Sequence, residues 1–82
     1  MRKILERCFK NLKSNLYETR GDHLRSFILP VRGLEHFGAT YISIPFTKTY
    51  YHTFKESSGK AIFDRSTLIL KKIIWDNGNI SY

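Results

Sequence analysis

The sequence has one cysteine, Cys8, and no apolar run that approaches the roughly 20 residues needed to cross a bilayer. A single thiol excludes an internal disulfide, and no Cys/His spacing typical of a zinc site is present. The N-terminus lacks the uninterrupted apolar stretch of a signal peptide. We therefore expect a protein of the reducing cytoplasm, the host cytoplasm if the chain is viral, with no membrane partner.

Acidic residues are also scarce, because 7 Asp and Glu stand against 14 Lys and Arg and leave a formal net charge of +7. Such an excess attracts phosphate backbones, anionic membranes or acidic proteins. Alanine occurs only at Ala39 and Ala61, whereas Ile, Lys, Asn, Tyr and Phe are plentiful. That bias is typical of AT-rich genomes, which many viruses and some bacteria have, and it favours a viral or phage protein.

The chain is long enough for one domain, which we expect to span residues 1–82. A content of 41% hydrophobic and 15% aromatic residues is typical of a folded chain rather than a disordered basic tail. A domain of this size buries a modest share of its surface, so a partner subunit would stabilise it. We therefore expect a homodimer.

Apolar residues near the N-terminus recur every three or four positions and predict an amphipathic helix from about Lys3 to Arg20. Gly21 follows the last periodic residue, where glycine commonly ends a helix. Cys8 lies on the apolar stripe and is expected to be a small buried hydrophobe rather than a nucleophile.

After Asp22 the apolar period becomes that of β-strands, with turn-forming residues every eight to twelve positions. Leu24 to Val31 and Ala39 to Phe46 are predicted strands, separated by a loop from Gly33 to Gly38. Pro30 and Pro45 each indicate a strand end or a sheet edge. A further strand is predicted from Thr49 to Lys55 because aromatic and polar residues alternate there.

The last third of the chain predicts two hairpins. Glu56 to Gly59 is expected to form a turn or loop, followed by strands Lys60 to Asp64 and Thr67 to Trp75, the latter a strand rather than a short helix because of its β-branched residues. Asn77-Gly78 predicts a type I′ turn and a C-terminal hairpin. The fold class is therefore α+β: one N-terminal amphipathic helix packed on an antiparallel sheet of about four to six short strands.

The polar face of the predicted helix is the first candidate site. It is rich in cations that could bind phosphates, and residues 1–20 carry more of the positive excess than the rest of the chain. A solvated surface that happens to be basic is the alternative. An anionic membrane surface would also suit the helix, although its apolar stripe is needed to cover the sheet. The residues are Arg2, Lys3, Arg7, Lys10 and Lys13.

The second candidate is the segment from Lys48 to Lys55, in which aromatic rings and cations interleave. Such mixtures hold single-stranded nucleic acid, because rings stack on bases while lysines neutralise phosphates. Only alternate residues of a strand share a face, so one set of rings would belong to the core. The candidate binding residues are Lys48, Tyr50, His52 and Lys55.

His23, His36 and His52, together with tyrosines and cations, are residue types from which metal-independent ribonucleases draw a general acid and base. In size, charge and fold class the chain is similar to bacterial toxins of the RelE kind, which cleave messenger RNA. No residue motif accompanies that similarity, and the chain has one clear helix where those toxins have two. We predict no catalytic residue, no metal ligand and no cofactor.

The leading functional hypothesis is a non-enzymatic nucleic-acid-binding protein, with RNA favoured over DNA because the aromatic residues lie on predicted strands and no second helix is evident. The alternative from another class is a small virus-encoded inhibitor or regulator that binds an acidic host protein. A RelE-like ribonuclease is the second alternative.

Overall fold

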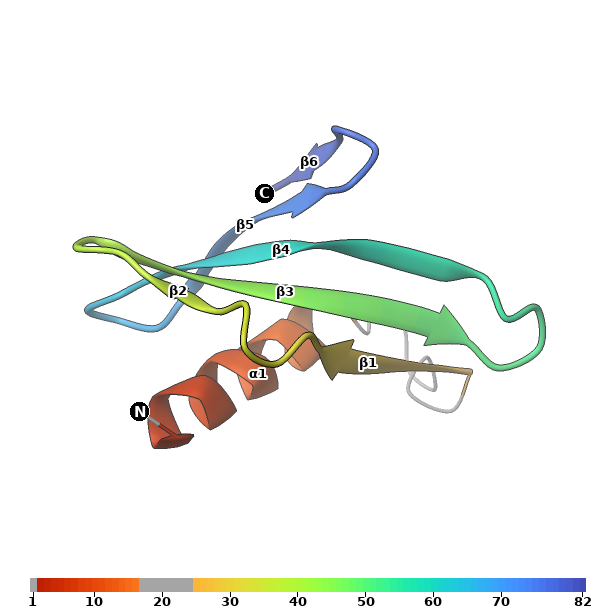
Figure 1. The fold of residues 1–82 in the computed structure, drawn as a ribbon, viewed down its shortest axis with the longest axis horizontal. Coiled ribbons are helices and arrows are strands. Elements are labelled where there is room, and N and C mark those ends of the chain that lie inside the picture. Colours follow the sequence, from red (N-terminus) through yellow and green to blue (C-terminus); the bar gives the residue numbers. More distant parts are fainter. Residues whose placement is uncertain (1, 17–24) are drawn as a thin grey trace.

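The computed structural model describes residues 2–16 and 25–82. Within these ranges the chain forms one helix and a six-stranded antiparallel sheet, with strand order β1-β3-β4-β5-β6 and β2 paired to β3 beside β1 (Figure 1). The α+β prediction is therefore confirmed. The elements are α1 (Arg2–Leu16), β1 (Ser26–Pro30), β2 (His36–Phe37), β3 (Tyr41–Tyr50), β4 (Glu56–Asp64), β5 (Leu70–Trp75) and β6 (Ile80–Ser81).

Helix α1 packs its apolar stripe on one face of the sheet (Figure 1). Cys8, Leu12 and Leu16 are buried on this side, as the three-and-four spacing predicts. Burial raises the pKa of the Cys8 thiol, which fits its predicted role as a small hydrophobe. Residues 17–20 of the predicted helix lie outside the described residues.

Strand β3 runs through Pro45, so the prediction of a strand end or edge at this residue is wrong. The Val31 N–H donates to the Pro45 carbonyl at 2.9 Å, which places that carbonyl on the β1 side of β3. The N–H and C=O of a strand residue point the same way, so the missing N–H of Pro45 also faces this side, where β1 has just ended at Pro30. No hydrogen bond between β3 and β4 is lost.

The aromatic segment after Thr49 is also corrected. Strand β3 ends at Tyr50, and residues 51–55 form the loop to β4 rather than a strand. The predicted loop Glu56–Gly59 is instead the first half of β4. Gly59 packs so closely on β5 that a Cβ there would lie 2.8 Å from the Ile74 carbonyl oxygen. Glycine is thus needed here for close approach of two backbones, not for a turn.

Of the remaining predictions of strands and turns, some are confirmed and others are wrong. Strand β1 lies inside the predicted strand 24–31, whose first residue is outside the described residues, and the predicted loop 33–38 contains the short strand β2. Both C-terminal hairpins, β4–β5 and β5–β6, are confirmed. The prediction of a type I′ turn is wrong, because of Asn77 and Gly78 only Gly78 has a positive φ, and its N–H donates to the Trp75 carbonyl. That is a three-residue loop closed by a left-handed glycine.

The two faces of the sheet differ in what covers them. Ile42, Ile44 and Phe46 of β3 point toward α1 and form the core with their neighbours on β4 and β5. On the opposite face no element from the described ranges packs on the sheet (Figure 1). Helix α1 itself is too short and too polar to cross a membrane, and the described chain has no other helix.

Replacing Gly59 by alanine should lower the free energy of unfolding by about 1–3 kcal/mol, because the new Cβ would press on backbone atoms of Ile74 and Trp75 that cannot move independently. Urea unfolding followed by Trp75 fluorescence measures the change. Ser57→Ala, at an exposed position on the same strand, should stay within about 0.5 kcal/mol of the parent. Equal stability of Gly59→Ala and the parent would contradict the close approach.

Candidate functional site

The outer side of α1 carries a row of cations. Lys3, Arg7 and Lys10 follow one another at intervals of four and three residues, so they share the side of the helix opposite to the Cys8–Leu12 stripe. All three are exposed, and none makes a hydrogen bond or ion pair through its side chain with another described residue. We call these three residues the basic ridge.

The two other cations predicted on this helix differ from the ridge. Lys13 is exposed and its ammonium lies 4.8 Å from the centre of the Phe9 ring, toward the edge of the apolar stripe. Arg2 is the first residue of α1, and its side chain lies outside the described part of the structure. The basic ridge therefore contains three of the five predicted cations.

Beside the ridge lies an open hollow of about 460 Å³ between α1 and the β4–β5 loop. Arg7 and Lys10 line it from the helix, and Thr67 lines it from the loop. Asn11 and Leu68 complete the lining, so no carboxylate takes part. A hollow with two cations and a hydroxyl has the donors that a phosphate group requires.

A hydrogen bond joins the β4–β5 loop to the helix, and an apolar side chain of the loop packs on the core. The side-chain amide of Asn11 donates to the Leu68 carbonyl at 2.8 Å, and the Leu68 side chain packs against the core. Leu68 has a left-handed φ of 61°, which is costly for a branched residue, but its packing compensates for that strain. The loop therefore holds Thr67 at a set position relative to Arg7.

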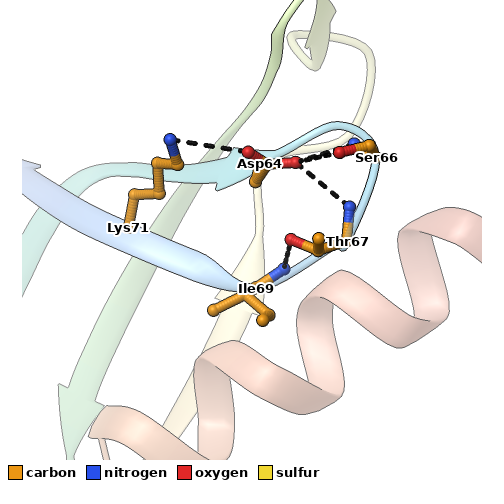
Figure 2. A network of polar contacts seen from close by, with 5 residues as sticks. All are labelled: Asp64, Ser66, Thr67, Ile69 and Lys71. Atoms are coloured by element: carbon orange, nitrogen blue, oxygen red, sulfur yellow. Dashed lines mark hydrogen bonds and ion pairs between the residues drawn. The ribbon is translucent and has the colours of Figure 1, made fainter.

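Asp64 stabilises the same loop from its other side (Figure 2). Its carboxylate accepts the hydroxyl and N–H of Ser66 at 2.6 and 2.9 Å and the N–H of Thr67 at 3.1 Å. Lys71 approaches it at 3.4 Å. These hydrogen bonds, above all that from the Ser66 hydroxyl, hold the pKa of Asp64 far below its ordinary value. The negative charge of Asp64 is thus compensated by donors of the loop and by Lys71 of β5.

Lys48 does not belong to the exposed surface. Only 6% of its area is accessible, and its ammonium donates to the Leu16 carbonyl at the end of α1 over 3.1 Å. It also lies 5.2 Å from the centre of the Tyr50 ring. A cation is favourable at the negative end of a helix dipole, so Lys48 ties the helix to β3.

The remaining predicted residues lie at the turn between β3 and β4. Tyr50, the last residue of β3, is exposed, and so are His52 and Lys55, because they lie in the loop that follows, where the alternation of a strand does not apply. Figure 1 places this turn at one end of the sheet and the N-terminal part of α1 toward the other end. The structure therefore does not bring the two predicted groups together.

The described histidines are also far apart. His36 pairs with Ser43 on β3, whereas His52 follows the end of that strand at Tyr50. Seven residue steps of about 3.3 Å place these two positions about 23 Å apart along the strand. They cannot act together on one phosphodiester, and His23 lies outside the described residues. In the described ranges no group of three or more His, Cys, Asp or Glu side chains could hold a metal ion.

Three residues of these sites escaped the sequence prediction. Asn11 and Thr67 are polar residues without a distinctive local pattern, and only the packing of the loop on α1 brings them to the ridge. The segment Asp64 to Thr67 does carry a signal, because Asp followed by Ser and Thr favours a turn closed by the carboxylate. Phe54 lies in the predicted aromatic segment but is not among its four candidate binding residues, although 79% of its area is accessible.

The Asp64 network should make stability depend on pH. An unfolded Asp protonates near pH 4, and a depressed folded pKa means that the stabilisation is complete above this pH, declines below it, and is lost as the pH falls through the lower folded pKa. The thermal midpoint of the parent should exceed that of Asp64→Asn at about pH 6 and approach it at about pH 2.5. Ser66→Ala, which removes one donor, should show a smaller difference of the same sign. A difference that stays constant with pH would refute the role given to Asp64.

Comparison with known proteins finds no family model, no curated protein and no solved structure that matches this chain. The function proposed below therefore rests on the chain's own residues and geometry.

Proposed function

We propose that this protein binds nucleic acid without modifying it, and RNA in preference to DNA. The observation that carries the proposal is the hollow beside the basic ridge, where Arg7, Lys10 and Thr67 face the same space without a lining carboxylate. A phosphate there would accept hydrogen bonds from a guanidinium, an ammonium and a hydroxyl. The Asn11 contact to the loop preforms this arrangement, so little ordering is needed on binding.

Charge supports the same partner. The ridge cations make no ion pair with the described residues, so binding a polyanion would not require breaking one. The net charge of +7 adds long-range attraction. Binding of this kind releases counterions and is therefore steeply weakened by salt.

RNA is favoured over duplex DNA on two grounds. A helix that reads a major groove is usually held there by a second helix, and α1 is the only helix in the described residues. The rings exposed at the β3–β4 turn suit bases that are not already paired and stacked, which RNA loops and single strands offer.

Removing two ridge cations in the double variant Arg7→Ala/Lys10→Ala should weaken binding to single-stranded RNA and lower the slope of log K against log salt by about 1.4, which is two phosphate contacts. Fluorescence anisotropy at several salt concentrations measures both, and a gel run afterwards shows whether the RNA stays intact.

The matched control is Lys60→Ala/Lys72→Ala, which removes the same charge from the sheet face opposite α1. It should change the slope by less than half as much as the ridge variant does. Equal losses in the two double variants would mean that net charge alone is responsible, and cleaved RNA would support the ribonuclease reading instead.

A second function is favoured by the uncovered sheet face. Leu29 of β1, Ile74 of β5 and Ile80 of β6 are exposed there. Their accessible areas are 56%, 36% and 47%. Apolar side chains at an open face suit a protein partner, as expected of a virus-encoded inhibitor that binds a host protein.

If this second function holds, the parent protein should capture a partner from nuclease-treated host lysate, and the variant Leu29→Glu/Ile80→Glu should not capture it. The RNA affinity of that variant should equal that of the parent. Retention of the same proteins by parent and variant would exclude the open face as their docking site.

A further inference from the structure

The turn between β3 and β4 is an exposed group of aromatic and basic side chains at the end of the two longest strands (Figure 1). The Tyr50 N–H donates to the Lys55 carbonyl at 3.0 Å, and the Phe54 N–H donates to the Tyr50 carbonyl at 2.9 Å. These bonds close the loop between β3 and β4, so its backbone is defined although every one of its side chains is exposed. We call residues 50–55 the hairpin tip.

Two aromatic rings of the tip differ in how they pack against the sheet. Tyr51 lies against Phe27 of β1, with ring centres 5.3 Å apart, and still has 48% of its area accessible. Phe54 has 79% of its area accessible, more than any other phenylalanine in the described chain. One ring is thus held in place by the sheet, and the other projects into solvent.

The backbone of Phe54 has an unfavourable conformation. Its φ is 53°, in the left-handed region where glycine or asparagine is the usual residue. The β4–β5 loop has the same pattern of closing bonds, with Leu68 in the equivalent left-handed position. Leu68 compensates for its strain by packing against the core. Phe54 does not pack against the core formed by the described residues, so neither backbone preference nor that core accounts for a phenylalanine at this position.

We infer that the hairpin tip stacks on unpaired nucleobases, with Phe54 and Tyr51 as the stacking rings. This inference rests on the proposed function and adds the kind of nucleic acid, namely single strands or loops rather than duplex. Duplex bases already stack on their neighbours and offer no open face to a protruding ring.

Charge at the tip favours nucleic acid over an apolar protein surface as the occupant. Lys55 is exposed within the tip, and Arg25 is exposed beside it, where its carbonyl accepts the Tyr51 N–H. Glu56 is the neighbouring carboxylate on β4. Rings flanked by two cations match the alternation of bases and phosphates along a single strand.

Phe54→Gly tests the inference, because it removes the ring and also relieves the left-handed backbone. The probes are a fluorescein-labelled RNA of about 12 nucleotides without self-complementarity and its fully paired duplex. The variant should bind the single strand about tenfold more weakly than the parent and the duplex within about twofold. Its thermal midpoint should equal or exceed that of the parent, which excludes unfolding as the cause.

Ile69→Ala is the matched control, since it removes an exposed apolar side chain from the β4–β5 loop, and it should leave both affinities unchanged. Unchanged single-strand affinity in Phe54→Gly overturns the inference and assigns the ring to a protein contact, whereas equal losses on both probes overturn the claimed selectivity. If the ridge variant weakens both probes and Phe54→Gly weakens neither, only the inference fails. If the parent binds neither probe, the proposed function fails with it.

Discussion

Strand β3 is the element on which the rest of the fold depends, because it pairs with β1 and β2 along one side and with β4 along the other. A proline within such a strand is allowed only where its missing N–H has no partner to lose. Pro45 meets this condition because its nitrogen faces the side of β3 that carries β1 and β2. It lies between the stretch of β3 paired with β2 (42–43) and the stretch paired with β1 (46–50). The proline therefore lies at the gap between β1 and β2, where no strand of the described residues pairs with that side of β3. For this reason β3 can continue through it.

The unbroken register of β3 also explains why Lys48 is buried. Residues two apart on a strand share a face, so Lys48 follows Ile44 and Phe46 toward α1. Its long side chain then reaches the Leu16 carbonyl, one of those that a helix leaves unpaired at its end. A strand that ended at Phe46 would have lost this register, and with it the link between the sheet and the helix.

Those elements whose pattern is local were predictable from the sequence. The spacing of Cys8, Leu12 and Leu16 identifies the helix, and Asn77-Gly78 identifies the last hairpin even though the turn type differs. The region from Tyr50 to Gly59 was not predictable, because its residue types contradict its structure. The tip is rich in residues typical of strands, whereas the following polar segment becomes a strand only through contacts with β3 and β5, such as the pair Thr47 and Ser58.

The same distinction applies to the candidate sites. The basic ridge follows from helical periodicity alone, since the side opposite an apolar stripe can be read from the sequence. The hollow does not, because Thr67 comes from a loop far along the chain that Asn11 and Asp64 hold in place. The exposure of Phe54 likewise depends on where β3 ends, which the tertiary pairing decides.

In the function proposed for this chain, ridge and tip are separate surfaces with different roles in binding. Contacts to phosphates supply affinity that is indifferent to sequence, whereas contacts to bases distinguish one nucleic acid from another. Because the N-terminal part of α1 and the β3–β4 turn lie toward opposite ends of the sheet (Figure 1), the contributions of ridge and tip to the binding free energy should be nearly additive. In the proposed function, the left-handed backbone of Phe54 lowers stability, and its exposed ring would in return distinguish unstacked from stacked bases.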